Sequence, residues 1–321
     1  MLSVSELKIG DIMTFDGERD ENGKIDPLSH LIMILTDSEV SHGALFLQHN
    51  PSALADAGLS GLHAHLVSDT GDVLRPVHIC RLKSADFIDL TPVIEVANKY
   101  IDENLVYPMP DLILLGMILV YKNISHVSLK QKVVIKLLKL ITAKIKSILE
   151  DKLYDGKHAM ICSEFVYQCY LDAAKEHPEL KLVLKNGDLQ ASLRQRTSVT
   201  LLDYFIDQVA NKKNEFIMDD ANVSGELSSE SETDLIQMAI DGIHEENVLF
   251  QKNNELSNAI QGFLVAQQRL KGTPVYTLKG LIKSAKDQEA FFVTPNDLLC
   301  HIANADNLGK FELYRKEEIF K

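Results

Sequence analysis

The chain has 321 residues, of which 45% are hydrophobic and 25% are charged, the balance of a globular protein with one large or two ordinary domains. The net charge of −13 disfavours a general nucleic-acid partner, because counterion release requires a basic surface. The start shows no basic segment followed by an apolar one, and the longest apolar run, 112–121, is well short of the roughly 20 residues of a membrane span. We expect a cytoplasmic protein, or one delivered into another cell without a classical signal peptide.

The first third of the chain predicts closely spaced antiparallel strands among short helices. Gly10-Asp11 is a turn that leads into a short strand within 7–16. The residues Asp69-Thr70-Gly71-Asp72 predict a hairpin turn between two of the later strands. The pattern predicts helices at 28–36 and 91–104 and strands at 40–48, 61–69 and 72–82. This order favours an α+β fold.

Residues 112–149 have a helical pattern with lysines on one side of its second half. Lys132, Lys136, Lys139 and Lys146 recur at helical spacing opposite aliphatic residues, which predicts a basic amphipathic helix. Such a helix is usually a surface helix with a solvated lysine face. The alternative is peripheral contact with an anionic membrane through Lys132, Lys136 and Lys139.

The later part of the chain changes its charge. Residues 215–246 contain ten Asp or Glu and no Lys or Arg, and the stretch "SGELSSESETD" within them, residues 224–234, predicts a mobile linker. A helical pattern then runs from Leu235 towards Leu270. Near the end, Thr294-Pro295-Asn296 predicts a turn that caps a short helix.

Cys162 is the candidate nucleophile. It precedes Ser163 and Glu164 at the start of a predicted helix, where unsatisfied N–H groups and the helix dipole favour a thiolate. The same helix end offers N–H donors to an oxyanion. The other cysteines, Cys80, Cys169 and Cys300, lie in apolar contexts and are interpreted as core residues, and the cysteine spacing suggests no zinc site.

A nucleophilic cysteine needs a base, and His42 is the best placed of 11 histidines. It begins a predicted apolar strand and precedes Gly43, which leaves room beside the imidazole. His63 and His65 alternate on one face of the next predicted strand, and one of them would reach the His42 ring if the two strands are neighbours. The competing interpretation is that these are hydrogen-bonded core histidines.

Three segments, in this order, resemble one family. "LKIGDIMTFDG", "LSHLIMILTDSEVSHGALFL" and "YDGKHAMICSEFVYQCY" are similar to the circularly permuted NlpC-type papain-like hydrolases, which include YiiX-like proteins and lecithin:retinol acyltransferase relatives. The late stretch that begins "FFVTPNDLL" resembles the closing segment of that family. The resemblance covers residues 7–85, 150–175 and 290–315.

The resemblance implies roles for individual residues. It implies Cys162 as nucleophile, His42 as base, His65 rather than His63 as the residue that orients His42, and Tyr154 as a side chain lining the site. Many bacterial members carry a glutamate in the third position. Glu164 matches the family motif and is expected to support the helix rather than to react.

The fold implied is a permuted papain-like α+β domain, an antiparallel sheet packed on helices. We expect the catalytic domain at residues 1–200 plus 291–321, and an acidic, mostly helical insertion at 201–290. The expected activity is cleavage of an amide bond in a peptide or protein through an acyl-enzyme, with no metal or cofactor. The alternatives are an acyl-lipid or thioester hydrolase or acyltransferase at a membrane surface, and a non-catalytic scaffold.

Overall fold

The structure is a computed structural model of the chain. It describes residues 3–17, 19, 23–58, 61–70, 73–103, 109–122, 129–150, 160–185, 200–209, 231–243, 253–273, 275–287, 290 and 293–320. Within these ranges, residues 73–75, 286–287 and 315–320 are described by their backbone alone.

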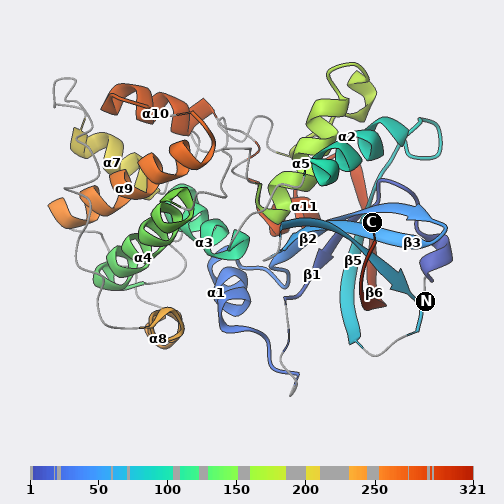
Figure 1. Cartoon of the computed structure of the whole chain (residues 1–321), viewed down its shortest axis with the longest axis horizontal. Coiled ribbons are helices and arrows are strands. Elements are labelled where there is room, and N and C mark those ends of the chain that lie inside the picture. The colour runs from blue at the N-terminus through green and yellow to red at the C-terminus, as the bar shows by residue number, and fades with distance from the viewer. Residues whose placement is uncertain are drawn as a thin grey trace.

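Six antiparallel strands close a barrel, on the right in Figure 1. The order around the barrel is β1-β2-β3-β4-β6-β5, and β5 pairs with β1 to complete it. The strands are β1 (Ile12–Phe15), β2 (His42–His49), β3 (Ser52–Gly58), β4 (Gly61–Ser68), β5 (Val73–Leu82) and β6 (Ala305–Phe320). The expected α+β class with antiparallel strands is therefore confirmed.

Alternation along the strands divides the barrel residues between two cores. Met13, Phe15, Phe46 and Leu54 belong to one cluster, which fills the barrel. Their strand neighbours, such as Leu45, belong to the larger cluster, which lies under the helices outside. Because successive strand residues point to opposite faces, one strand supplies both cores.

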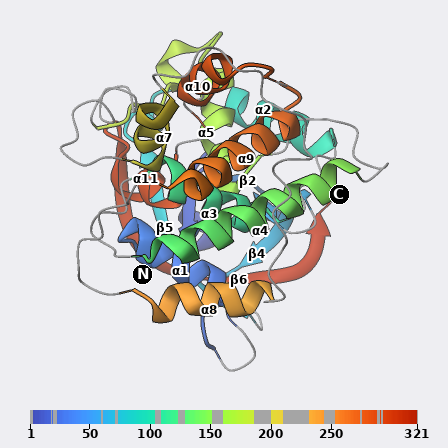
Figure 2. The same cartoon turned by 90° about the vertical axis from the view of Figure 1, so that its left-hand side faces the viewer.

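The helices form two groups. Beside the barrel lie α2 (Thr91–Asp102), α5 (Cys162–Ala173) and α11 (Pro295–Cys300), with short 3₁₀ turns at Val4–Glu6 and Pro178–Leu180. The second group, on the left in Figure 1 and facing the viewer in Figure 2, contains α3 (Pro110–Tyr121), α4 (Gln131–Glu150), α7 (Leu201–Val209), α8 (Glu232–Asp241), α9 (Asn254–Leu270) and α10 (Leu278–Asp287). Helix α1 (Pro27–Thr36) packs on α3 and α8 of this group.

Helix α3 explains the long apolar run of the sequence. Residues 110–121 are all buried except Asp111, which is partly exposed, as expected of a helix that is apolar on every side and surrounded by others. Gly116 allows close packing on α9, because a Cβ there would lie 2.4 Å from the Phe263 ring. Within the described part of the chain, no helix has the length and apolar character needed to cross a bilayer.

Two strands were not predicted, and they change the pairing. β3 separates β2 from β4, so the strand that carries His65 is not the neighbour of the strand that carries His42. β6 comes from the end of the chain and lies between β4 and β5. The predicted hairpin pairing across residues 69–72 is therefore wrong, since a distant segment occupies the position beside β4.

The predicted insertion packs on helices from the first part of the chain. Helices α8 and α9, from 201–290, contact α4, from 1–200, and all belong to the larger apolar core. The division at these boundaries stays a prediction. The acidic linker lies mostly outside the described residues, since 210–230 and 244–252 are not described.

The lysine face of α4 meets acidic side chains. Lys139 Nζ lies 2.6 Å from Glu255 of α9, and Lys144 Nζ lies 3.3 Å from Glu232 of α8. Helix α4 is therefore held in part by charge pairing with the later helices. Membrane contact through Lys132, Lys136 and Lys139 stays a prediction.

Candidate active site

Cys162 is the first residue of α5, as the sequence predicts. Its side chain is fully buried. The first hydrogen bond across this helix end runs from the Phe165 N–H to the Ile161 carbonyl, so the N–H groups of residues 162–164 precede the intrahelical ladder. The end of α5 therefore presents N–H donors beside the thiol.

His42 is the first residue of β2, opposite Phe15 of β1. One of its ring nitrogens, the Cys162 sulfur and a carboxylate oxygen of Asp111 all lie within 4.8 Å of one another. The structure thus brings together the predicted nucleophile and the predicted base, which are far apart in sequence.

Gly43 lies where the β2 strand meets the α5 and α11 helices. A Cβ at this position would lie 3.6 Å from the Ser163 Cα and 3.7 Å from the Ser163 nitrogen, which are ordinary contact distances, and 3.2 Å from a Leu298 methyl group of α11, which is tight. The missing side chain therefore makes room mainly for Leu298. The neighbouring His42 lies beside the start of α5, next to Cys162.

Asp56 of β3 is the side chain that contacts His42. Its Oδ2 lies 3.1 Å from His42 Nε2, and its Oδ1 lies 3.1 Å from His65 Nε2. Asp56 pairs with Ala44, two residues along β2 from His42, so the two side chains share a face. Asp56 is only 2% exposed.

The expected neighbourhood of the His42 and His65 strands is wrong, and the role of His65 as the orienting residue stays a prediction that these contacts do not favour. Because β3 separates β2 from β4, His65 reaches the opposite oxygen of Asp56 instead of the His42 ring. The adjacent His63 makes an edge contact with His65, with ring centroids 6.2 Å apart. Sequence reasoning missed Asp56; its signal was a lone carboxylate within the small apolar run "SALADAG".

The charges around His42 favour the imidazolium. Burial alone would lower its pKa, but the charge of a Cys162 thiolate and the hydrogen bond to Asp56 outweigh burial, and the pKa of His42 lies well above its ordinary value. A carboxylate only accepts hydrogen bonds, so His42 Nε2 donates to Asp56 and Nδ1 is left for the thiol.

Two contacts fix the start of α5 from outside the barrel. The Ser163 hydroxyl donates to the Val293 carbonyl over 2.7 Å. Glu164 accepts from the Ile161 N–H and forms a buried ion pair with Lys271 at the end of α9. Burial lowers the pKa of Lys271, although Glu164 opposes that shift. Glu164 is therefore placed as a support of the helix, as expected.

The late segment resembling the family's closing motif lies beside both β2 and α5. Thr294 caps α11 by accepting from the Asp297 N–H, and Leu298 of the same helix lies next to Gly43. Asp297 pairs with Lys122 and His301; burial opposes its ionisation, but these partners hold its pKa below the ordinary value.

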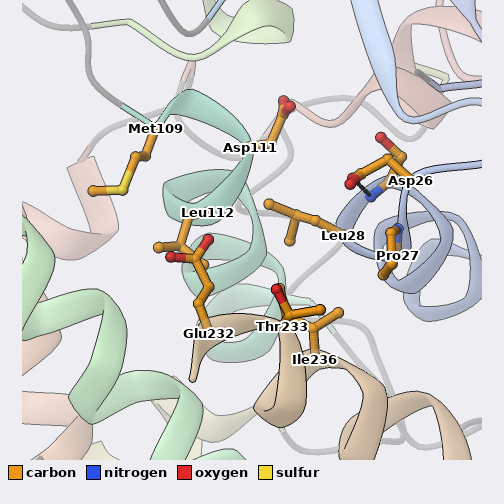
Figure 3. A pocket seen from close by; sticks show the side chains of 10 residues that line it. Asp26, Pro27, Leu28, Met109, Asp111, Leu112, Glu232, Thr233 and Ile236 are labelled. Atoms are coloured by element: carbon orange, nitrogen blue, oxygen red, sulfur yellow. Dashed lines mark hydrogen bonds between the residues drawn. The ribbon is translucent and has the colours of Figure 1, made fainter. Parts of the chain in front are cut away.

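Asp111 was not predicted, and it joins the Cys–His pair to a cavity. The cavity has a volume of about 200 Å³ and lies between the starts of α1, α3 and α8 (Figure 3). Its walls combine apolar side chains with the three carboxylates of Asp26, Asp111 and Glu232. The full lining is Asp26, Pro27, Leu28, Ser29, Met109, Asp111, Leu112, Glu232, Thr233 and Ile236. Asp111 and His42 are partly exposed, whereas Cys162 is buried.

The remaining sequence candidates lie away from this cluster or outside the described residues. Tyr154 falls in the segment 151–159, which the structure does not describe. Cys80 and Cys169 are buried, as expected, and burial raises the pKa of Cys80 to about 12. Cys300 is exposed, so its interpretation as a core residue is wrong: it is the last residue of α11.

Comparisons with protein-family models, with curated proteins and with solved structures found no match for this chain.

Proposed function

We propose that this protein is a cysteine hydrolase that cleaves an amide bond, peptide or isopeptide-like, through an acyl-enzyme on Cys162. The observation that carries the proposal is the arrangement of Cys162, His42 and Asp56 on three elements. A ring nitrogen of His42 lies within 4.8 Å of the sulfur, and the carboxylate is 3.1 Å from the ring nitrogen Nε2. This is the nucleophile, base and orienting group that covalent acyl transfer needs.

The first half-reaction uses the proton of the thiol. His42 Nδ1 takes this proton, and the sulfur attacks the carbonyl carbon of the substrate. The tetrahedral intermediate collapses when His42 returns the proton to the leaving amine, which departs as the C–N bond breaks. Asp56 holds the ring with Nε2–H toward itself and stabilises the imidazolium.

The second half-reaction consumes water. His42 takes a proton from the water as it attacks the thioester, and the acid is released when the proton returns to the Cys162 sulfur. In both steps the carbonyl oxygen becomes negative. The N–H groups at the start of α5 are the donors available to stabilise it.

The cavity beside Asp111 would receive a part of the substrate. Apolar walls suit an aliphatic portion, and the carboxylates favour a positively charged or N–H-bearing group over an anion. A peptide side chain that ends in a cation fits this combination better than an anionic lipid headgroup. The barrel, the cysteine helix and the segment around Thr294 also have the order expected from the permuted NlpC-type resemblance, which supports assignment to that class.

The experiment compares Cys162→Ala, His42→Ala and Asp56→Ala with the unaltered protein on panels of peptide, isopeptide, acyl-ester and thioester substrates. We expect amide cleavage that is lost in the first two variants and strongly reduced in the third. Cys300→Ser is the matched control, because that thiol is exposed and outside the site.

Trapping identifies the covalent step. After a brief reaction with an acyl-donating inhibitor, mass mapping should find the acyl group on Cys162. Hydrolysis that survives Cys162→Ala would overturn the proposal. Cleavage of esters but not amides would replace amide hydrolysis with acyl-ester hydrolysis.

A further inference from the structure

The cluster around the thiol contains a third donor that the hydrolytic mechanism does not use. Asp111, in the first turn of α3, places a carboxylate oxygen within 4.8 Å of both the Cys162 sulfur and a His42 ring nitrogen. The three side chains come from α3, α5 and β2, which belong to the buried framework of the protein. A sulfur, a nitrogen and an oxygen thus converge from three elements.

The distances suit a small tetrahedral ion. Zinc lies about 2.0 to 2.3 Å from its ligand atoms, so the ligands of one ion are roughly 3.5 Å apart. Donor atoms that already lie within 4.8 Å of one another therefore need to approach by at most about 1.3 Å. Rotation of the Asp111 and Cys162 side chains supplies this movement while His42 keeps its hydrogen bond to Asp56.

The surroundings of His42 also match those of a metal ligand. Histidines that bind zinc usually donate their other ring N–H to a carboxylate, which fixes the tautomer and the ring orientation. The contact of His42 Nε2 with Asp56, at 3.1 Å, supplies this arrangement and leaves Nδ1 for the metal. The same hydrogen bond that prepares a base therefore prepares a ligand.

The donor types select the metal. Thiolate and imidazole favour zinc over magnesium and calcium, which prefer oxygen ligands. Three protein ligands leave a fourth position for water. A Cys–His pair alone would offer only two ligands, so Asp111 is the residue that completes the set.

We infer that His42, Asp111 and Cys162 bind one Zn²⁺ reversibly and that the bound ion blocks the thiol. The metal takes the sulfur lone pair that would attack the substrate and the Nδ1 lone pair that would accept the proton. The site loses no covalent bond, so removing the ion restores it. The inhibitory consequence rests on the proposed hydrolase, whereas the binding of metal does not.

The test measures zinc binding directly. The full chain is stripped of metal with a chelator, dialysed, and titrated with zinc chloride against a chromophoric zinc chelator. We expect one tight site, weakened at least tenfold by Asp111→Asn and lost in Cys162→Ser. Glu232→Gln, which alters another carboxylate of the same cavity, and Cys300→Ser are controls that should bind zinc as the unaltered protein does.

Two further readouts exclude a folding artefact. Cobalt substitution should give a near-ultraviolet sulfur-to-metal charge-transfer band that Cys162→Ser abolishes, and circular dichroism should show that Asp111→Asn keeps its fold. Zinc should also slow alkylation of Cys162 by iodoacetamide in the unaltered protein, much less in Asp111→Asn, and a chelator should reverse the effect.

The outcomes separate this inference from the proposed function. Zinc affinity unchanged by Asp111→Asn, or zinc that leaves Cys162 alkylation unaffected, overturns the three-ligand site even if the metal-free protein hydrolyses amides. Binding that needs all three residues, in a protein that hydrolyses nothing, supports the site and overturns the hydrolase.

Discussion

Replacing Asp56 by asparagine removes a buried charge while keeping the volume and one hydrogen-bond acceptor. The carboxylate accepts a hydrogen bond from His42 on Oδ2 over 3.1 Å, and its Oδ1 lies 3.1 Å from His65 Nε2. An asparagine with its oxygen toward His42 preserves the ring orientation but no longer stabilises the imidazolium by charge. The pKa of His42 should therefore move down toward its ordinary value.

The size of the effect follows from the charge of the bond. A hydrogen bond to a charged group contributes about 1.5 to 3 kcal/mol and a neutral one about 0.5 to 1.5 kcal/mol, a difference of about 1 to 1.5 kcal/mol. Because Asp56 is 2% exposed, water screens little of this difference. We expect the equilibrium constant for protonation of the His42 ring to fall about tenfold.

The assay is an NMR titration of the His42 ring in protein labelled on histidine, with the resonance assigned by its loss in His42→Gln. His65→Asn is the matched control. It removes a competing donor from Asp56, which leaves the carboxylate more available to His42. The midpoint for His42 should therefore rise or stay unchanged in His65→Asn and fall in Asp56→Asn.

Stability should follow the same linkage. The folded-state pKa of His42 is raised, so its contribution is fully present below the unfolded value of about 6.5 and is lost as the pH rises through the folded-state pKa. Asp56→Asn should therefore destabilise the protein more at pH 6 than at high pH in urea unfolding. If His65→Asn, and not Asp56→Asn, lowered the His42 midpoint, His65 would be the orienting residue and the argument from the contacts would fail.

Three other substitutions test the frame around the site. Gly43→Ala adds a Cβ 3.2 Å from a Leu298 methyl group, so we expect a loss of about 1 kcal/mol in urea unfolding; unchanged stability would contradict close packing of β2 on α11. Lys271→Met leaves Glu164 buried without its ion partner and should lower the free energy of unfolding by about 3 to 5 kcal/mol. The double variant with Glu164→Gln should recover much of this loss. Additive losses in the double-mutant cycle would contradict a coupled pair. The folded-state pKa of Asp297 is lowered, so its contribution to the free energy of unfolding is present above the unfolded value of about 3.9 and is lost as the pH falls through the folded-state pKa. In Asp297→Asn, the free energy of unfolding should therefore fall less steeply at acid pH. An unchanged slope at acid pH would refute this origin.

The positions of Cys162 and His42 were predictable because their signals are local. A cysteine at the start of an apolar helix pattern and a histidine before a glycine at the start of a strand each show in a few adjacent residues. The structure places both residues as the first of their elements. Their proximity depends on how β2 packs on α5 and α11, which the local sequence does not show.

The third group of the site was not predictable in the same way. "SALADAG" lacks the β-branched and aromatic residues that indicate strands, so β3 was missed and Asp56 with it. A prediction without β3 places the strand of His65 directly beside the strand of His42. Asp111 was missed because it begins a helix whose remaining residues are almost all apolar, and its proximity to Cys162 depends on the packing of α3.

The position of β6 affects how this protein folds during translation. Strand β6, residues 305–320, pairs with both β4 and β5, whose residues are synthesised more than two hundred positions earlier. The edges of β4 and β5 therefore remain unpaired while the helices that separate them from β6 in the sequence are synthesised. Chaperone dependence and slow maturation are the expected signature, and a nascent chain halted before residue 305 should present unpaired strand edges and no finished barrel.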